Sequence, residues 1–181
     1  MHVDTKKIAV SGMLAAFSAV LMYASTMFET STLFLIALAS FSVGIVIREW
    51  GNRTGFAFWV ASTLIHFLIV PNKFYCGTYL AMGLYILLSE VLWEKIAESG
   101  YLTYRRSLLW LGKFIIFDIM FVPAVLFLQG LIFQREISTM EMLIVVAVGQ
   151  VALIVYDNAY RYFQTVIWGR IRINIVLKGK M

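Results

Sequence analysis

The sequence predicts an all-α integral membrane protein: a six-helix transmembrane bundle with short loops and both termini in the cytoplasm. Of its 181 residues, 61% are hydrophobic and only 14% are charged, and the mean hydropathy is +0.85. A soluble domain is about half apolar and about a quarter charged, so this chain has too few charges to cover a globular surface. Its apolar runs are long and continuous, whereas a membrane β-barrel would show alternating segments of roughly ten residues.

Six apolar runs are interpreted as spans, because a helix needs about 20 mostly apolar residues to cross a bilayer. The runs are Ile8–Phe28, Thr32–Ile47, Gly55–Val70, Phe74–Trp93, Leu108–Phe133 and Met142–Tyr160. The second and third are short, so five spans with these two as a re-entrant pair are the alternative. No segment between the spans is long enough to fold alone, and we expect a single transmembrane domain over residues 1–181.

The basic residues predict the orientation, because cytoplasmic flanks of membrane proteins carry an excess of Lys and Arg. With the N-terminus inside, six spans place thirteen of the 15 basic residues on the cytoplasmic side. Only Lys73 and Arg135 fall outside. The net charge of +5 is therefore explained by topology and by contact with lipid headgroups, and we expect no nucleic-acid partner.

Signatures of common enzyme classes are missing from the sequence. There is no Walker phosphate loop, no HExxH zinc motif and no GxSxG nucleophile elbow. His2 and His66 are the two histidines, and Cys76 is the single cysteine, which excludes a disulfide scaffold. We expect no enzymatic activity, no cofactor and no metal site.

The first apolar run carries a stripe of small residues. It reads Ser11-Gly12-Met13-Leu14-Ala15-Ala16-Phe17-Ser18-Ala19, so Ser11, Ala15 and Ala19 follow one another at spacings of four on one helix face. Small side chains allow close approach of another helix in a membrane, where water provides no hydrophobic driving force. Packing within the bundle is the alternative explanation of the same stripe.

A six-helix chain of this length with Ala15 and Ala19 in its first helix resembles the substrate-binding S component of an energy-coupling-factor transporter. The run Val70-Pro71-Asn72-Lys73, together with Tyr79 and Tyr85, is similar to members of that group without a vitamin-specific signature. The resemblance implies a prokaryotic plasma-membrane protein that binds a small molecule such as a vitamin. It also implies a transmembrane coupling subunit and paired ATPases as partners, with Ser11, Ala15 and Ala19 in the docking face.

Polar residues in the outer half of the last four predicted spans are candidates for a solute site. They are diverse hydrogen-bonding groups near aromatic residues, which suits recognition of a small molecule. The candidates are His66, Asn72, Lys73, Tyr79, Gln129, Arg135 and Glu141. Lys73 and Arg135 would favour an anionic ligand through charge-assisted bonds. Alternatively, His66 is a core histidine with satisfied contacts, Tyr79 belongs to an aromatic belt, and the loop residues are solvated.

Two further groups of polar residues are expected inside or near the membrane. Asp118 and Gln150 lie near the middle of the fifth and sixth runs, either as a link between these helices or as the floor of the pocket. Asp157 and Arg161 are four residues apart on the sixth run and should pair. Glu90 and Glu94, at the inner end of the fourth run, lie within reach of the basic loops.

A second class of function fits the same composition. Small multispan proteins of the bacterial cell-shape and envelope machinery also have five or six helices and almost no loops. The alternative to a solute-binding subunit is therefore a membrane scaffold that does not transport.

Overall fold

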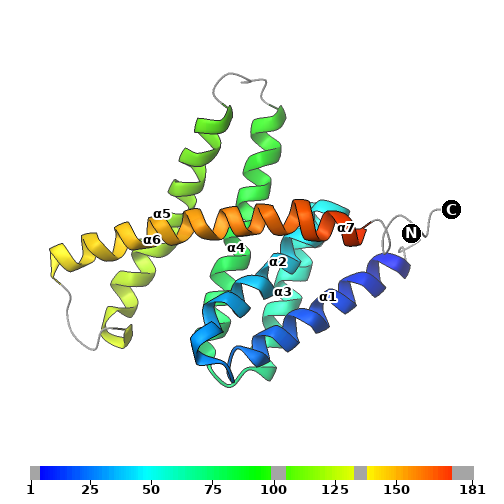
Figure 1. The fold of residues 1–181 in the computed structure, drawn as a ribbon, viewed down its shortest axis with the longest axis horizontal. Coiled ribbons are helices and arrows are strands. Elements are labelled where there is room, and N and C mark those ends of the chain that lie inside the picture. Colours follow the sequence, from blue (N-terminus) through cyan, green and yellow to red (C-terminus); the bar gives the residue numbers. More distant parts are fainter. Residues whose placement is uncertain (1–4, 99–104, 133–137, 173–181) are drawn as a thin grey trace. The chain divides into compact units, whose positions relative to one another are not determined.

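The computed structural model describes residues 5–98, 105–132 and 138–172, and within these the chain is all-helical (Figure 1). Its contacts divide the chain into two compact units. Unit 1 comprises Met1–Val91 and Trp168–Met181, and unit 2 comprises Leu92–Ile167. The single domain expected over the whole chain stays a prediction.

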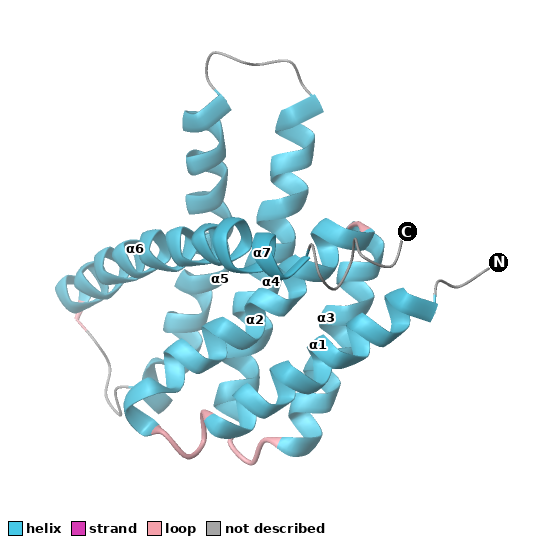
Figure 2. Cartoon of the chain, turned by 45° about the vertical axis from the view of Figure 1, so that its right-hand side comes forward, coloured by secondary structure: helices cyan, strands magenta, loops and turns pink. Residues whose placement is uncertain are grey.

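Unit 1 is built from four long helices and one short one. Its elements are α1 (Thr5–Ala24), the 3-10 turn η1 (Glu29–Ser31), α2 (Thr32–Trp50), α3 (Asn52–Ile69), most of α4 (Lys73–Glu98) and α7 (Gly169–Arg172). Helices α1, α2 and α3 pack on one another. The connections α1–α2 and α3–α4 are short loops at the same end of this unit (Figure 2).

Contacts along α1 and α2 show that these helices are antiparallel. Ser18 bonds to the carbonyl of Ala39 in mid-helix, and Thr32 bonds to the carbonyl of Ser25 at one end. The start of α1 therefore lies level with the last turn of α2. Gly51 joins α2 to α3 with a φ of 85°, a left-handed conformation that glycine adopts without steric cost.

Helix α2 is the most enclosed element of unit 1. All residues from Ala39 to Ile47 are buried, which explains why this stretch of sequence is apolar or small on every side of the helix. Close packing against α3 depends on Gly55, because a Cβ at this position would lie 2.1 Å from the Cγ1 atom of Ile47.

Unit 2 is mainly a pair of long helices in contact with each other. It contains α5 (Arg105–Ile132), α6 (Thr139–Tyr162) and most of the π-helix η2 (Phe163–Trp168). Helix α6 begins with a capping box, in which Ser138 and Glu141 exchange side-chain to backbone hydrogen bonds. Gly149 on α6 faces the ring of Phe121 on α5, where a Cβ would lie 2.7 Å from Cε1.

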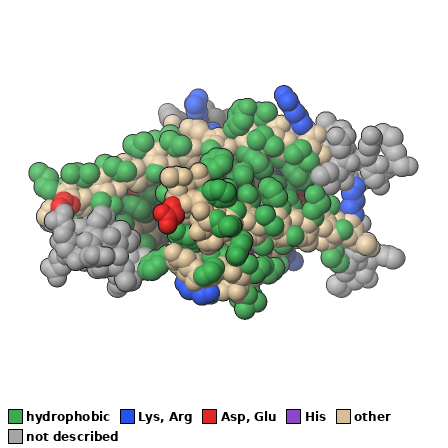
Figure 3. All heavy atoms as spheres, turned by 60° about the horizontal axis from the view of Figure 1, so that its bottom comes forward, with side chains coloured by type: hydrophobic (Ala, Val, Ile, Leu, Met, Phe, Trp, Pro, Cys, Tyr) green, Lys and Arg blue, Asp and Glu red, His purple; other side chains and the backbone are tan. Residues whose placement is uncertain are grey.

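Among the described residues, five helical stretches are long and apolar enough to cross a membrane. They are Thr5–Ala24, Glu29–Trp50, Lys73–Ala97, Arg106–Leu126 and Met140–Arg172. Helix α3 is not one of them, but its 18 residues make it about 27 Å long at 1.5 Å per residue. Large apolar side chains such as Leu68, 87% exposed, stand on the surface, and hydrophobic side chains are spread over the described surface in the view of Figure 3. A multi-pass helical membrane protein is consistent with these features.

Candidate functional site

A fully buried polar cluster lies inside the apolar helices of unit 1. It consists of Ser18 from α1, Ser62 and His66 from α3, and Tyr79 from α4, and each of these residues is at most 1% exposed. Polar groups with this degree of burial require hydrogen-bond partners, because loss of water is otherwise unfavourable.

Local helix geometry brings these side chains together. Ser62 and His66 are four residues apart, so they share one face of α3. Ser18 lies on the buried face of α1 with Leu14 and Met22. The phenol of Tyr79 extends from α4 to the same level, where its oxygen lies 2.8 Å from Ser62 Oγ.

The two contacts of Ser18 favour one tautomer of His66. Ser18 Oγ donates to the carbonyl of Ala39 at 3.3 Å and lies 3.2 Å from His66 Nε2. In the tautomer that satisfies both contacts, Ser18 gives its single proton to the Ala39 carbonyl and accepts from an Nε2–H group of His66. His66 Nδ1 is then the acceptor nitrogen of a neutral imidazole.

Other contacts hold the imidazole ring in place. The rings of His66 and Tyr79 meet edge to face, with centroids 4.2 Å apart and an interplanar angle of 88°. The thiol of Cys76 donates to the carbonyl of His66 at 3.4 Å. This arrangement leaves His66 Nδ1 buried and without a hydrogen-bond partner among the described residues. It can accept a hydrogen bond from an N–H or O–H group.

Of the candidate solute-site residues, the structure brings His66 and Tyr79 into contact. Asn72 and Lys73 lie beyond them, at the junction of α3 and α4, and both are exposed. Asn72 Oδ1 accepts from the backbone N–H of Phe74 at 3.0 Å. Lys73 Nζ donates to the carbonyls of Phe67 and Val70 at 2.6 and 3.1 Å, which caps the end of α3.

The remaining solute-site candidates belong to unit 2 or lie outside the described residues. Glu141 takes part in the capping box of α6. Gln129 is on α5, and its side chain is outside the described part of the structure, as is the whole of Arg135. Whether these residues meet a solute stays a prediction.

The stripe of small residues on α1 lies at the flank of the buried face. Ser11, Ala15 and Ala19 are half-buried, whereas Gly12 and Ala16, on the outer side of the stripe, are exposed. Ser11 Oγ itself is buried and has no hydrogen-bond partner among the described residues. The docking role of this stripe stays a prediction.

Ser18 and Ser62 are the members of the cluster that sequence reasoning missed. Ser62 could have been found, because it precedes His66 by one helical turn on the same face. Ser18 lies within the small-residue run of α1, but its contact with His66 joins residues 48 positions apart. The pattern within one helix contains no signal for such a contact.

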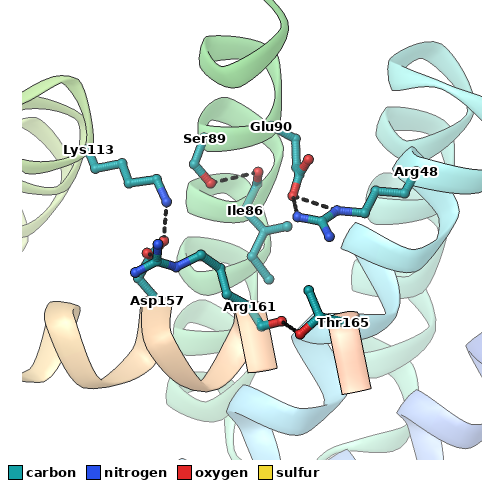
Figure 4. Close-up of polar contacts among 8 residues, drawn as sticks. All are labelled: Arg48, Ile86, Ser89, Glu90, Lys113, Asp157, Arg161 and Thr165. Carbon is teal, nitrogen blue, oxygen red and sulfur yellow. Dashed lines mark hydrogen bonds and ion pairs between the residues drawn. The ribbon is translucent and has the colours of Figure 1, made fainter. Parts of the chain in front are cut away.

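The other polar groups expected within the membrane are paired. Gln150 Nε2 donates to Asp118 Oδ1, which links α6 to α5. The expected pair of Asp157 and Arg161 is confirmed, with 3.1 Å between Oδ2 and Nε. In unit 1, Arg48 Nη2 lies 2.6 Å from Glu90 Oε1 (Figure 4).

Within the described ranges, no three His, Cys, Asp or Glu residues are grouped so that they could hold a metal ion. Comparison of the chain with family models, curated proteins and solved structures finds no match.

Proposed function

We propose that this chain is the substrate-binding membrane subunit of an energy-coupling-factor-like uptake transporter in a prokaryotic plasma membrane. The observation that supports it best is the Nδ1 atom of His66, which is buried in an apolar helical unit without a hydrogen-bond partner among the described residues. Ionisable and polar residues within membrane helices commonly mark the path or binding site of a solute.

The ligand in this proposal donates an N–H or O–H group to His66 Nδ1. The ring of Tyr79 restrains the imidazole, and its hydroxyl, at hydrogen-bond distance from Ser62, provides a second polar group. Both side chains are 0% exposed, so a ligand reaches them only when α1, α3 and α4 separate. Binding would then be coupled to closure of these helices.

The distribution of charge in unit 1 supports the orientation in this proposal. Because α1, α2, α3 and α4 alternate in direction, Lys6, Arg48 and Arg53 lie at one end of the unit. The α7 segment lies at the same end, since Arg172 Nε is 2.8 Å from Glu49 Oε1. Lys73 is at the opposite end. We propose that the end rich in basic residues is cytoplasmic.

The partners in this proposal are a transmembrane coupling subunit and paired ATPases. Ser11, Ala15 and Ala19 form the docking face, where half-buried small side chains would let a partner helix approach closely. Ala15→Trp and Ala19→Trp should block assembly with the partner while the isolated chain still folds. Unfolding of both variants would instead assign the stripe to internal packing.

The ligand proposal is tested by native mass spectrometry of the purified protein. Wild type should retain a small molecule, and His66→Phe should retain about tenfold less, since it loses one hydrogen bond but keeps an aromatic ring. Cys76→Ala is the control, because Cys76 is equally buried and contacts the His66 carbonyl rather than Nδ1. Equal retention by both variants would contradict a site at His66. A wild-type protein that carries no small molecule but purifies with other envelope proteins would favour the scaffold.

A further inference from the structure

Two cations share one carboxylate in unit 2. Lys113 Nζ lies 2.5 Å from Asp157 Oδ1, and Arg161 Nε lies 3.1 Å from Asp157 Oδ2. Figure 4 shows Lys113 and Arg161 converging on this carboxylate. The trio carries one positive charge in excess. The side chain of Asp157 is 0% exposed, whereas that of Arg161 is 46% exposed, so the excess charge is accessible at the guanidinium.

A tryptophan lies next to both cations. Lys113 Nζ is 5.7 Å and the guanidinium carbon of Arg161 is 5.3 Å from the centroid of the Trp110 ring. These are cation–π distances. Arg106 lies one turn before Trp110 on the same face of α5, and it is exposed. Tryptophan beside Lys and Arg is the composition found where a membrane helix meets the headgroup region.

We propose that Lys113 and Arg161, with Trp110 beside them, bind the phosphate group of an anionic lipid. Arg161 Nε forms an ion pair with Asp157 Oδ2, and Arg161 Nη2 donates to Asn158 Oδ1 at 2.6 Å. A guanidinium has five N–H groups, so donors remain on its exposed side for phosphate oxygens. Charge-assisted bonds of this kind are among the strongest in proteins.

The surroundings of the cations favour a lipid over a free phosphate ion. Ile154, two turns before Arg161 on the same face of α6, is 39% exposed, and Tyr162 is 62% exposed. On α5, Leu111 is 59% exposed. Exposed apolar side chains around a cationic group match the acyl chains and the phosphate of one lipid molecule. Anionic lipids are also concentrated at the cytoplasmic leaflet, and the six-span topology expected from the sequence places the start of α5 and the end of α6 on that side.

The test is lipid retention by the purified full-length protein. Protein reconstituted with equal amounts of phosphatidylglycerol and phosphatidylcholine is extracted and examined by native mass spectrometry. Wild type should retain phosphatidylglycerol preferentially, and Arg161→Gln should retain about tenfold less. Lys113 still pairs with Asp157 in this variant, so its fold should persist. Arg53→Gln, which removes an exposed arginine of unit 1, should behave as wild type.

A second variant separates lipid binding from a purely structural role of the cluster. Asp157→Asn removes the competing carboxylate and leaves both cations, so phosphatidylglycerol retention should rise. A structural cluster would instead show lower retention and lower thermal stability in both Asp157→Asn and Arg161→Gln. If Asp157→Asn does not fold, the comparison of Arg161→Gln with Arg53→Gln decides alone.

Inorganic phosphate distinguishes the two sources of the phosphate group. Phosphate added at the molar concentration of the lipid should not displace phosphatidylglycerol, because it lacks the acyl chains. Three outcomes would each overturn the proposal: displacement of phosphatidylglycerol by phosphate, equal retention of both lipids by wild type, or unchanged retention of phosphatidylglycerol by Arg161→Gln. The small-molecule peak tested with His66→Phe is measured separately, so either idea can fail while the other holds.

Discussion

Gly55 on α3 lies directly against Ile47 on α2. A Cβ atom at position 55 would stand 2.1 Å from Cγ1 and 3.2 Å from Cα of Ile47. The second of these atoms belongs to the backbone, and a β-branched side chain in a helix has little freedom to rotate away. The two helices must therefore separate if residue 55 acquires a side chain.

We predict that Gly55→Ala lowers the free energy of unfolding by about 1–3 kcal/mol, the usual cost of overpacking a core. The control is Gly12→Ala on α1, where a Cβ would meet nothing within 4 Å. That variant should be unchanged or up to about 1 kcal/mol more stable, because alanine favours the helix. Thermal or denaturant unfolding in detergent measures the stability of both variants. Equal stability of the two variants would show that α2 and α3 do not meet at this glycine.

Ser18→Ala should destabilise unit 1 by about 1 kcal/mol, because it removes the hydroxyl that contacts both His66 Nε2 and the Ala39 carbonyl. Ser31→Ala is the matched control, since Ser31 is exposed and its side chain makes no capping bond to α2. Unfolding by increasing concentrations of a denaturing detergent compares the two. A loss in Ser31→Ala as large as that in Ser18→Ala would argue against the link between α1 and α3.

Glu49 should anchor the C-terminal helix α7 to α2. It accepts from Trp168 Nε1 at 3.0 Å and pairs with Arg172 Nε at 2.8 Å. We expect Glu49→Ala to speed tryptic cleavage after Arg170 and Arg172, and Glu49→Gln to have a smaller effect because an amide still accepts the tryptophan bond. Glu29→Ala, at the exposed η1 turn, should cleave at the wild-type rate. Unchanged cleavage in Glu49→Ala would contradict the anchor.

The hydrogen bond from Gln150 to Asp118 should couple α5 to α6. A double-mutant cycle of Asp118→Leu and Gln150→Leu is expected to give a coupling energy of about 0.6 kcal/mol, the average for such bonds between membrane helices, and at most about 1.7 kcal/mol. Asp118→Asn retains an acceptor oxygen and should lose less stability than Asp118→Leu. Additive effects of the two leucine variants would mean that the pair contributes nothing to helix association.

Cysteine labelling should report opposite sides of the membrane for the two ends of unit 1. In a Cys76→Ala background, a cysteine at Asn72 should react with an impermeant maleimide added from outside intact cells. A cysteine at Arg53 should react only after the cells are opened. Both native residues are exposed, so accessibility within the protein does not separate them. Reaction at both positions from outside would show that α3 does not cross the membrane, which would contradict the six-span topology.

Much of the helical architecture was predictable from the sequence. The apolar runs predicted six long helices in order. A bilayer requires about 20 mostly apolar residues per span, so each span is visible in the sequence as a long apolar run. Helix ends differed by a few residues: α5 begins at Arg105 rather than Leu108, and α6 at Thr139 rather than Met142. Polar residues at helix ends form capping turns and belong to the helix, so hydropathy alone underestimates its length.

The sequence also determined the ion pair between Asp157 and Arg161, which lie one helical turn apart on α6. Such contacts depend on the pitch of a single helix. The cluster of Ser18, Ser62, His66 and Tyr79 was decided by tertiary structure alone, because three helices must pack at one register before these side chains meet. Packing likewise assigned Lys73 to the end of α3, where backbone carbonyls left without helical partners attract an ammonium group.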